Sequence, residues 1–223
     1  MIFIIKDGVI LNREEKEKNI KFDIILNDEQ KLSKEQILNH PFSFIHGKAG
    51  SGKTLLACAT AADQFFKKHI QKIVVTRPTV ATEDNGFLPG GIDEKMDPWL
   101  VPIRHNFRKF YNKKEKWDNL ERDGFLEIIP LTYFRGQTFE NAICIVDEYQ
   151  NLTKNQLQMC IGRLGLNSRM IFCGDEQQID LKNRDNSAWF EVSKIQSSSH
   201  VFVTTLLENH RHPAVAELLE LLK

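Results

Sequence analysis

One stretch decides the fold, and it reads FSFIHGKAGSGKTLLACATAADQFF over residues 42–66. The apolar run Phe42–His46 predicts a short buried strand, and the Ala- and Leu-rich segment Thr54–His69 predicts a helix. Between them, Gly47–Thr54 (GKAGSGKT) is a complete GxxxxGK[ST] motif. A strand, this motif and a helix in that order are typical of a phosphate-binding loop, so the chain is predicted to bind a nucleotide.

The residue types of the loop suit this chemistry. Glycines let backbone N–H groups curve around an anion without a Cβ in the way, and the following helix points the positive end of its dipole at the same anion. Lys53 is predicted to reach the β- and γ-phosphates, and the Thr54 hydroxyl to ligate Mg²⁺. The predicted cofactor-binding residues are those of the whole loop: Gly47, Lys48, Ala49, Gly50, Ser51, Gly52, Lys53 and Thr54.

Outward from the loop, short apolar runs alternate with amphipathic stretches, the order typical of an α/β domain with a mainly parallel sheet and helices on both faces. Further strands are predicted at Lys72–Thr76, Phe125–Ile129, Ala142–Val146, Met170–Cys173 and Val201–Thr204. Helices are predicted from an N-cap at Asn27 to Asn39, over Pro102–Trp117 and Lys154–Leu164, after Ser187, and over Pro213–Leu222. The segment Thr79–Pro98 contains Pro and paired Gly, has no clear period, and is predicted to be a loop that is functional or mobile.

Composition places the chain among ordinary globular proteins. Its 223 residues are 41% hydrophobic and 27% charged, and 30 basic residues balance 30 acidic ones, which excludes a disordered chain and a strongly basic nucleic-acid coat. We expect an N-terminal appendage, with a hairpin, over residues 1–20 and one ATPase domain over residues 21–223. No apolar run is long enough for a signal peptide or a membrane span, and the four cysteines form no CxxC pair, which predicts a cytoplasmic protein with buried, reduced thiols.

Two carboxylates follow another predicted strand. The apolar run Ile143–Val146 leads directly into Asp147 and Glu148, at the strand end where open α/β sheets bind ligands. Asp147 is predicted to hold Mg²⁺, directly or through water, and Glu148 to orient and deprotonate an attacking water. Without the phosphate loop, a strand followed by an acidic helix cap would explain these residues equally well.

A third polar segment, GDEQQ at residues 174–178, follows the predicted strand Met170–Cys173 and faces the same crevice. Gln178 is the candidate to sense the γ-phosphate or the attacking water through its amide. A plain surface turn is the alternative.

Taken in order, Gly47–Thr54, residues 147–150 (DEYQ) and residues 174–178 (GDEQQ) resemble motifs I, II and III of superfamily 1 helicases. Residues 26–30 (LNDEQ) resemble the adenine-reading Q motif, and residues 207–211 (LENHR) resemble motif IV. Over residues 26–222 the chain more closely resembles the PhoH-like family of phosphate-starvation-inducible ATPases. This resemblance is carried by Arg77-Pro78, GFLPG at 86–90, KMDP at 95–98, Pro130-Leu131, Arg135-Gly136, DEYQN at 147–151, Gly174-Asp175 and RHP at 211–213.

The resemblance implies a RecA-like P-loop core that hydrolyses ATP, often linked to RNA. It implies that Gln30 reads adenine through N6 and N7, although its spacing from Asn27 also fits a helix capping box. It places Arg211 at the γ-phosphate, where a guanidinium speeds phosphoryl transfer. The chain departs from the family pattern at Lys48 and Ser51, both variable loop positions, and at Tyr149, where a small residue is usual.

The length suits one RecA-like lobe, whereas superfamily 1 helicases place ATP between two lobes. A neighbouring subunit is therefore predicted to supply the missing surface, in a homo-oligomer such as a ring. Arg135 is the candidate to act on its own site or to reach into a neighbour's. Arg77 follows a strand end, where it could contact phosphate or nucleic acid or form a structural salt bridge.

Two other functions stay open beside a Mg²⁺-dependent ATPase. The cations and aromatic residues of Arg104–Trp117 suit single-stranded RNA or DNA, as in a nucleic-acid-dependent helicase or remodelling subunit, although an amphipathic helix with buried aromatics explains them better. A small-molecule phosphotransferase is the second alternative. Thr79–Pro98 could serve as its lid, but Glu148 favours water as the acceptor.

Overall fold

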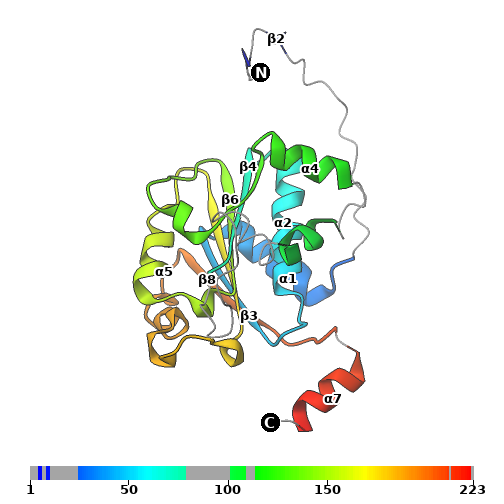
Figure 1. The fold of residues 1–223 in the computed structure, drawn as a ribbon, viewed down its shortest axis with the longest axis vertical. Coiled ribbons are helices and arrows are strands. Elements are labelled where there is room, and N and C mark those ends of the chain that lie inside the picture. Colours follow the sequence, from blue (N-terminus) through cyan, green and yellow to red (C-terminus); the bar gives the residue numbers. More distant parts are fainter. Residues whose placement is uncertain are drawn as a thin grey trace, which may run out of the picture.

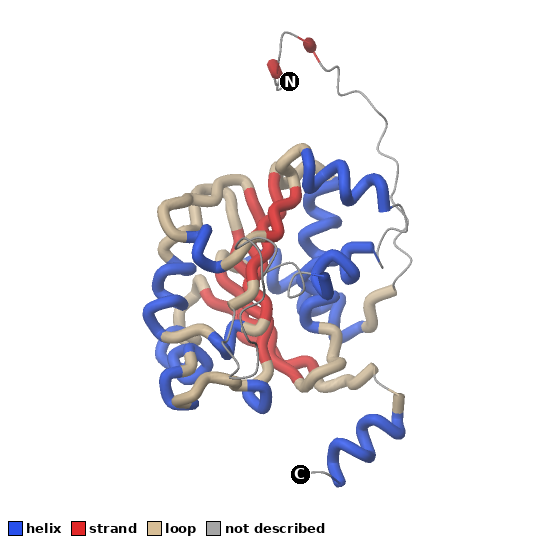
Figure 2. The backbone as a smooth tube through the Cα atoms, viewed as in Figure 1, coloured by secondary structure: helices blue, strands red, loops and turns tan. Residues whose placement is uncertain are grey.

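The computed structural model describes residues 5–6, 9–10, 25–78, 101–108, 114–210 and 212–221. Its centre is a six-stranded sheet in the order β5-β4-β6-β7-β3-β8, with every neighbouring pair parallel (Figures 1 and 2). The strands are β3 (Phe42–Gly47), β4 (Lys72–Thr76), β5 (Leu126–Ile128), β6 (Ala142–Asp147), β7 (Arg169–Gly174) and β8 (Val201–Leu206). The predicted parallel sheet is confirmed, and each boundary lies within two residues of its expected position.

Helices cover both faces of this sheet, as predicted (Figure 1). One face carries α1 (Asp28–Asn39), α2 (Lys53–Phe66), the helical residues 101–108 and α4 (Lys114–Arg122). The other carries α5 (Lys154–Ile161), α6 (Val192–Ile195) and the 3-10 turns η1 (Leu131–Phe134), η2 (Tyr149–Asn151) and η5 (Ala188–Glu191). The turns η3 (Glu176–Gln178) and η4 (Arg184–Asn186) follow β7, and α7 (Pro213–Leu221) ends the described chain.

Alternation along each central strand separates two apolar cores. The first core lies between the sheet and helices α1 and α2, and the second lies between the sheet and α5. In β3, Ile45 packs with the residues of α1 and α2, whereas its neighbour Phe44 packs with those of α5. In β6, Ile145 and Cys144 divide in the same way, and all six residues of that strand are buried. Because both faces are covered, β6 is apolar from Ala142 to Val146, a run typical of a strand in a buried parallel sheet.

Helix boundaries follow local signals. Helix α1 begins with the predicted capping box, in which the Asn27 side chain accepts from the backbone N of Gln30 and the Gln30 side chain accepts from the backbone N of Asn27. Helices α2 and α5 each end three residues earlier than predicted. Lys68 takes a left-handed φ of 60° just after α2, which ends that helix. Gly162 is the C-cap residue of α5.

The predicted helix over Pro102–Trp117 is helical at residues 101–108 and again from Lys114. Phe107 and Trp117 are buried in the first core with their ring centroids 5.0 Å apart, so these two aromatics serve packing. Residues 109–113, which include Phe110 and Tyr111, lie outside the described residues.

Near the N-terminus, β1 (Ile5–Lys6) and β2 (Val9–Ile10) pair antiparallel, as in the expected hairpin. The expected domain boundary at residue 20, the loop Thr79–Pro98 and Arg211 all lie outside the described residues. Among the helices that the structure describes, none has both the length and the apolar content needed to cross a membrane. All four cysteines are buried and unoxidised.

Candidate functional site: the phosphate loop and its carboxylates

The phosphate loop joins β3 to α2 at the carboxyl edge of the sheet, and its curve depends on glycine. Gly47 has a φ of +149° and Gly52 a φ of +85°. A Cβ at Gly47 would come within 2.5 Å of Ser51 Oγ, and one at Gly52 within 2.7 Å of Gln30 Nε2. The tight loop that cradles an anion with backbone N–H groups therefore needs glycine at both positions.

Lys53 is the first residue of α2, and its ammonium lies over the loop. Its Nζ donates to the carbonyl oxygen of Gly47 at 2.7 Å and to that of Lys48 at 3.2 Å. Ionised phosphate oxygens are stronger acceptors than these carbonyls. The side chain is thus already held where a phosphate would attract it.

The two predicted metal ligands meet directly. The Thr54 hydroxyl donates to Asp147 Oδ1 at 2.7 Å, although 93 positions separate them in the sequence. Burial of Asp147 raises its pKa to about 6, and the charge of Glu148 adds to this rise, against the lowering effects of the Thr54 hydrogen bond and of the charges on Arg77 and Lys53. The donors and cations around Asp147 therefore only partly offset the cost of burying its charge. The carboxylate oxygens of Asp147 and the hydroxyl oxygen of Thr54 fit the hard-oxygen preference of Mg²⁺.

Glu148 follows Asp147 in a left-handed conformation, with φ 53° and ψ 41°, which is uncommon for a residue with a side chain. Its Oε1 lies 3.5 Å from Arg77 Nη2 in an ion pair. Its Oε2 accepts from Gln150 Nε2 at 2.6 Å. Both oxygens of the predicted catalytic carboxylate are therefore held by neighbouring side chains.

Gln150, which was not predicted as a site residue, is fully buried and links two segments. Its Nε2 also donates to the backbone oxygen of Gln178 at 3.0 Å, and its Oε1 accepts from the backbone N of Asp175 at 3.2 Å. Gln178 in turn donates from Nε2 to Asp175 Oδ2 at 2.8 Å. One buried amide thus ties Glu148 to the segment after β7. In the sequence, only the position of Gln150 within DEYQ pointed to a role in the site. Its bonds follow from its burial, because a buried amide needs hydrogen-bond partners.

A cavity of about 490 Å³, within the usual size of ligand sites, gathers these groups. Its lining includes the predicted residues Gln30, Ala49, Gly50, Gly52, Lys53, Thr54, Glu148 and Gln178. It also includes four residues not predicted as site residues, namely Ile25, Leu55, Asn106 and His210. Asn106 comes from the helical residues 101–108, and no local pattern marks it, because only the fold brings it to the cavity.

Other predicted site residues do not line this cavity. Gly47, Lys48 and Ser51 belong to the loop but lie outside the lining, and Asp147 lies beneath it, bonded to Thr54. Arg135 is exposed in the turn after η1 and is not among the lining residues.

Gln30 combines both roles considered for it. Its Oε1 completes the capping box of α1, while its Nε2 lies beside Gly52 and the side chain lines the cavity. Because an amide oxygen has two lone pairs, the cap does not exhaust its capacity to accept. The adenine contact stays a prediction, and the capping box is confirmed.

Tyr149, where the resemblance leads us to expect a small residue, packs between His46 and Gly174. Its hydroxyl lies 2.6 Å from His46 Nε2, and a Cβ at Gly174 would come within 2.6 Å of its ring. Burial and then the charge of Lys53 lower the pKa of His46 to about 4, so this histidine is neutral at pH 7. Tyr149 packs in the second core with Phe44, and the glycine at 174 is what makes room for it.

The chain is similar to proteins of one known family. The family model described as PhoH-like protein matches residues 24–223. A PhoH-like protein of Synechocystis is 38% identical over 188 residues, which cover 82% of this chain and 57% of that protein. A PhoH-like protein of Bacillus subtilis is 40% identical over 179 residues, or 78% of this chain and 56% of that protein. The chain therefore spans a little over half the length of these relatives.

Among solved structures, the large terminase of a thermophilic bacteriophage has a similar fold. The TM-score is 0.58 at 8% identity, over 88% of this chain and 50% of the terminase chain. Likeness at this identity concerns the fold alone. The predicted RecA-like P-loop core is confirmed.

The raised pKa of Asp147 predicts how stability depends on pH in EDTA. Folded Asp147 keeps its proton to about pH 6, against an ordinary pKa of 3.8, so the free energy of unfolding should fall as pH rises between these values. Asp147→Asn removes the charge and keeps the acceptor for Thr54. We expect it to be more stable than wild type at pH 7 by on the order of 1–3 kcal/mol, with no gain near pH 4. Denaturant unfolding at both pH values measures this difference.

Asp63→Asn is the matched control of opposite sign. Burial raises the pKa of Asp63, but hydrogen bonds and charges from Lys34 and Lys67 outweigh it and lower the pKa below its ordinary value. This variant should lose stability at pH 7. An Asp147→Asn protein that is destabilised equally at both pH values would contradict the account of Asp147.

Proposed function

Since the chain belongs to the PhoH-like protein family, we propose that it is a Mg²⁺-dependent ATPase with a single RecA-like lobe, acting as a homo-oligomer. One observation carries the proposal, the 2.7 Å hydrogen bond between the Thr54 hydroxyl and Asp147. It brings a phosphate-loop hydroxyl and a strand-end carboxylate to one point, with Lys53 and Glu148 in the adjoining cavity. These are the groups that metal-assisted phosphoryl transfer requires.

The chain's own residues divide the work of hydrolysis. Lys53 and the backbone N–H groups of the loop hold the phosphates. Thr54 and Asp147 would hold Mg²⁺, which would supply positive charge to offset that of the phosphate oxygens. Glu148 orients the attacking water and accepts its proton, and Gln178, in the same cavity, helps to position it. Arg211, outside the described residues, is proposed from the family motif as the cation at the γ-phosphate.

We propose ATP as the nucleotide because the amide of Gln30 lies at the cavity, where it suits the N6 and N7 edge of adenine. The proposal does not extend to nucleic acid. In the basic stretch, Arg104 and Arg108 form ion pairs with residues of α4, and the two described aromatic residues are buried. Four buried thiols support a cytoplasmic location.

Exposed groups near the cavity support an oligomer. Ile25 lines the cavity yet is 89% exposed, and Leu207, just after β8, is 83% exposed. A neighbouring subunit would cover such apolar groups. Arg135 is exposed and does not line its own cavity, which suits a role in a neighbour's site.

Lys53→Ala should raise the Kd for ATP by at least about a hundredfold, because the phosphates lose a charged donor. The fold should survive, since within the described residues Lys53 donates to the loop carbonyls of Gly47 and Lys48. Titration with a fluorescent ATP analogue measures the affinity. Lys67→Ala is the control, a lysine at the other end of α2 that pairs with Asp63. Wild-type affinity in the Lys53 variant would refute the assigned phosphate loop.

Glu148→Gln should act differently, since it keeps the shape and removes the base. Mg²⁺-ATP should still bind, while hydrolysis should fall by at least about a hundredfold. Phosphate release and analogue binding, measured on the same preparation, separate the two effects. Glu191→Gln, which alters an exposed pair with Lys194, serves as control. Loss of binding instead would mean that Glu148 is a metal ligand or a structural residue.

Mixing two inactive variants tests the oligomer. If Arg135 acts in a neighbour's site, Arg135→Ala subunits and Glu148→Gln subunits should regain activity when mixed. Some contacts would then join an intact Glu148 to an intact Arg135. Steady-state phosphate release across mixing ratios should peak between the pure variants. A protein that stays monomeric at working concentration, with activity proportional to its concentration, would rule this arrangement out.

A further inference from the structure

We propose that Arg77 is a positioning residue that sets the place of the Glu148 carboxylate and so controls the rate of hydrolysis. This inference rests on the proposed function, in which Glu148 activates water. Arg77 acts through Glu148 and does not contact the nucleotide. Neither the phosphate-loop motif nor the carboxylate motif assigns it this role.

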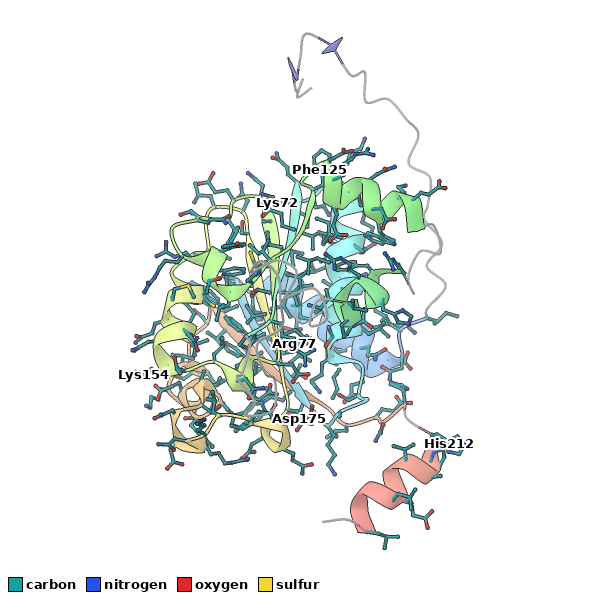
Figure 3. All side chains as sticks on the ribbon, in the orientation of Figure 1. Lys72, Arg77, Phe125, Lys154, Asp175 and His212 are labelled. Carbon is teal, nitrogen blue, oxygen red and sulfur yellow. The ribbon has the colours of Figure 1, made fainter. Side chains whose placement is uncertain are left out.

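The sheet register brings Arg77 to this position. Strands β4 and β6 are parallel neighbours in which Thr76 pairs with Val146. Arg77 therefore leaves the end of β4 beside the point where Asp147 and Glu148 leave β6. Figure 3 shows Arg77 and Lys72 at opposite ends of β4. Of these two residues, Arg77 lies at the carboxyl ends of the strands, where the phosphate loop also lies.

The charges in this corner need a cation. Asp147 and Glu148 are adjacent carboxylates at the end of β6. Arg77 forms its ion pair with Glu148, with Nη2 3.5 Å from Oε1. The side chains of Arg77 and Glu148 are 24% and 22% exposed, so solvent screens this pair less than a surface pair. An arginine stays charged at every accessible pH.

Glu148 is held from two sides, and the two contacts differ. Gln150 is buried, is bonded to Asp175 and Gln178, and holds Oε2 at a short 2.6 Å. Arg77 approaches Oε1 from the neighbouring strand. Without Arg77 the carboxylate would keep one anchor and could rotate about it. A misplacement of about 1 Å can cost about a hundredfold in rate. Arg77 is not among the residues that line the cavity, so its loss should leave ATP affinity unchanged.

The test compares Arg77→Ala and Arg77→Lys with wild type, with Lys72→Ala as the matched control. Lys72 is the first residue of β4, at the strand end opposite to Arg77, and its Nζ pairs with Glu127 Oε1 at 2.6 Å. We expect Arg77→Ala to lower kcat by about ten- to a hundredfold, with analogue affinity in Mg²⁺ unchanged within about twofold. Arg77→Lys should recover part of the loss, because it restores the charge but not the planar fork. Lys72→Ala should keep wild-type kcat.

A double-mutant cycle separates positioning from a structural role. In the Glu148→Gln background, Arg77→Ala should cause no further loss of the residual rate, because it acts through the missing base. Additive losses, an equal fall in affinity, or full kcat in Arg77→Ala would overturn the inference. If Arg77→Ala fails to fold, Arg77→Lys provides the test. Wild-type kcat in Arg77→Lys, with no defect in its double-mutant cycle with Glu148→Gln, would then overturn the positioning role of Arg77.

If wild type releases no phosphate, the proposed function fails as well. If wild type is active and Glu148→Gln is not, while Arg77→Ala keeps full kcat, this inference alone fails.

Discussion

The hydrogen bond from the Thr54 hydroxyl to Asp147 Oδ1 is the interaction on which the rest of the site depends. It joins the start of α2 to the end of β6 and fixes the distance between a phosphate loop and a buried carboxylate. Burying a carboxylate is costly unless positive charge or donors surround it. Here Thr54, Lys53 and Arg77 only partly offset that cost, which is why the pKa of Asp147 stays raised. The fold thus keeps the costly charge of Asp147 at a place where a bound cation would lower that cost.

Parallel topology explains how so few elements complete this site. Arg77 follows β4, Glu148 follows β6, Gln178 follows β7, the phosphate loop follows β3, and His210 follows β8. These five strands are consecutive neighbours in the sheet, and all of them point the same way. Their carboxyl ends therefore form one edge, where short loops place basic, acidic and amide groups side by side. Apolar cores pack against both faces of the sheet that carries this edge.

Local patterns could be read from the sequence, and contacts between distant segments could not. The strands and the phosphate loop were predictable because apolar runs, glycine spacing and strand-end carboxylates are all short-range signals. Asn106 and Ile25 carry no such signal, since only packing brings them to the cavity. Gln150 is similar, because its importance comes from bonds to Glu148 and to the segment after β7. The sequence left Arg77 open between a contact to phosphate or nucleic acid and a salt bridge, and the structure has a salt bridge to Glu148.

We propose that this edge of the sheet hydrolyses ATP with Mg²⁺ and passes the phosphoryl group to water. The most direct test measures ADP and inorganic phosphate released by the purified wild-type protein, with no acceptor added, in Mg²⁺ and in EDTA. We expect equal amounts of ADP and phosphate in Mg²⁺ and neither product in EDTA. Release that is independent of Mg²⁺, or no release until an acceptor is supplied, would contradict it.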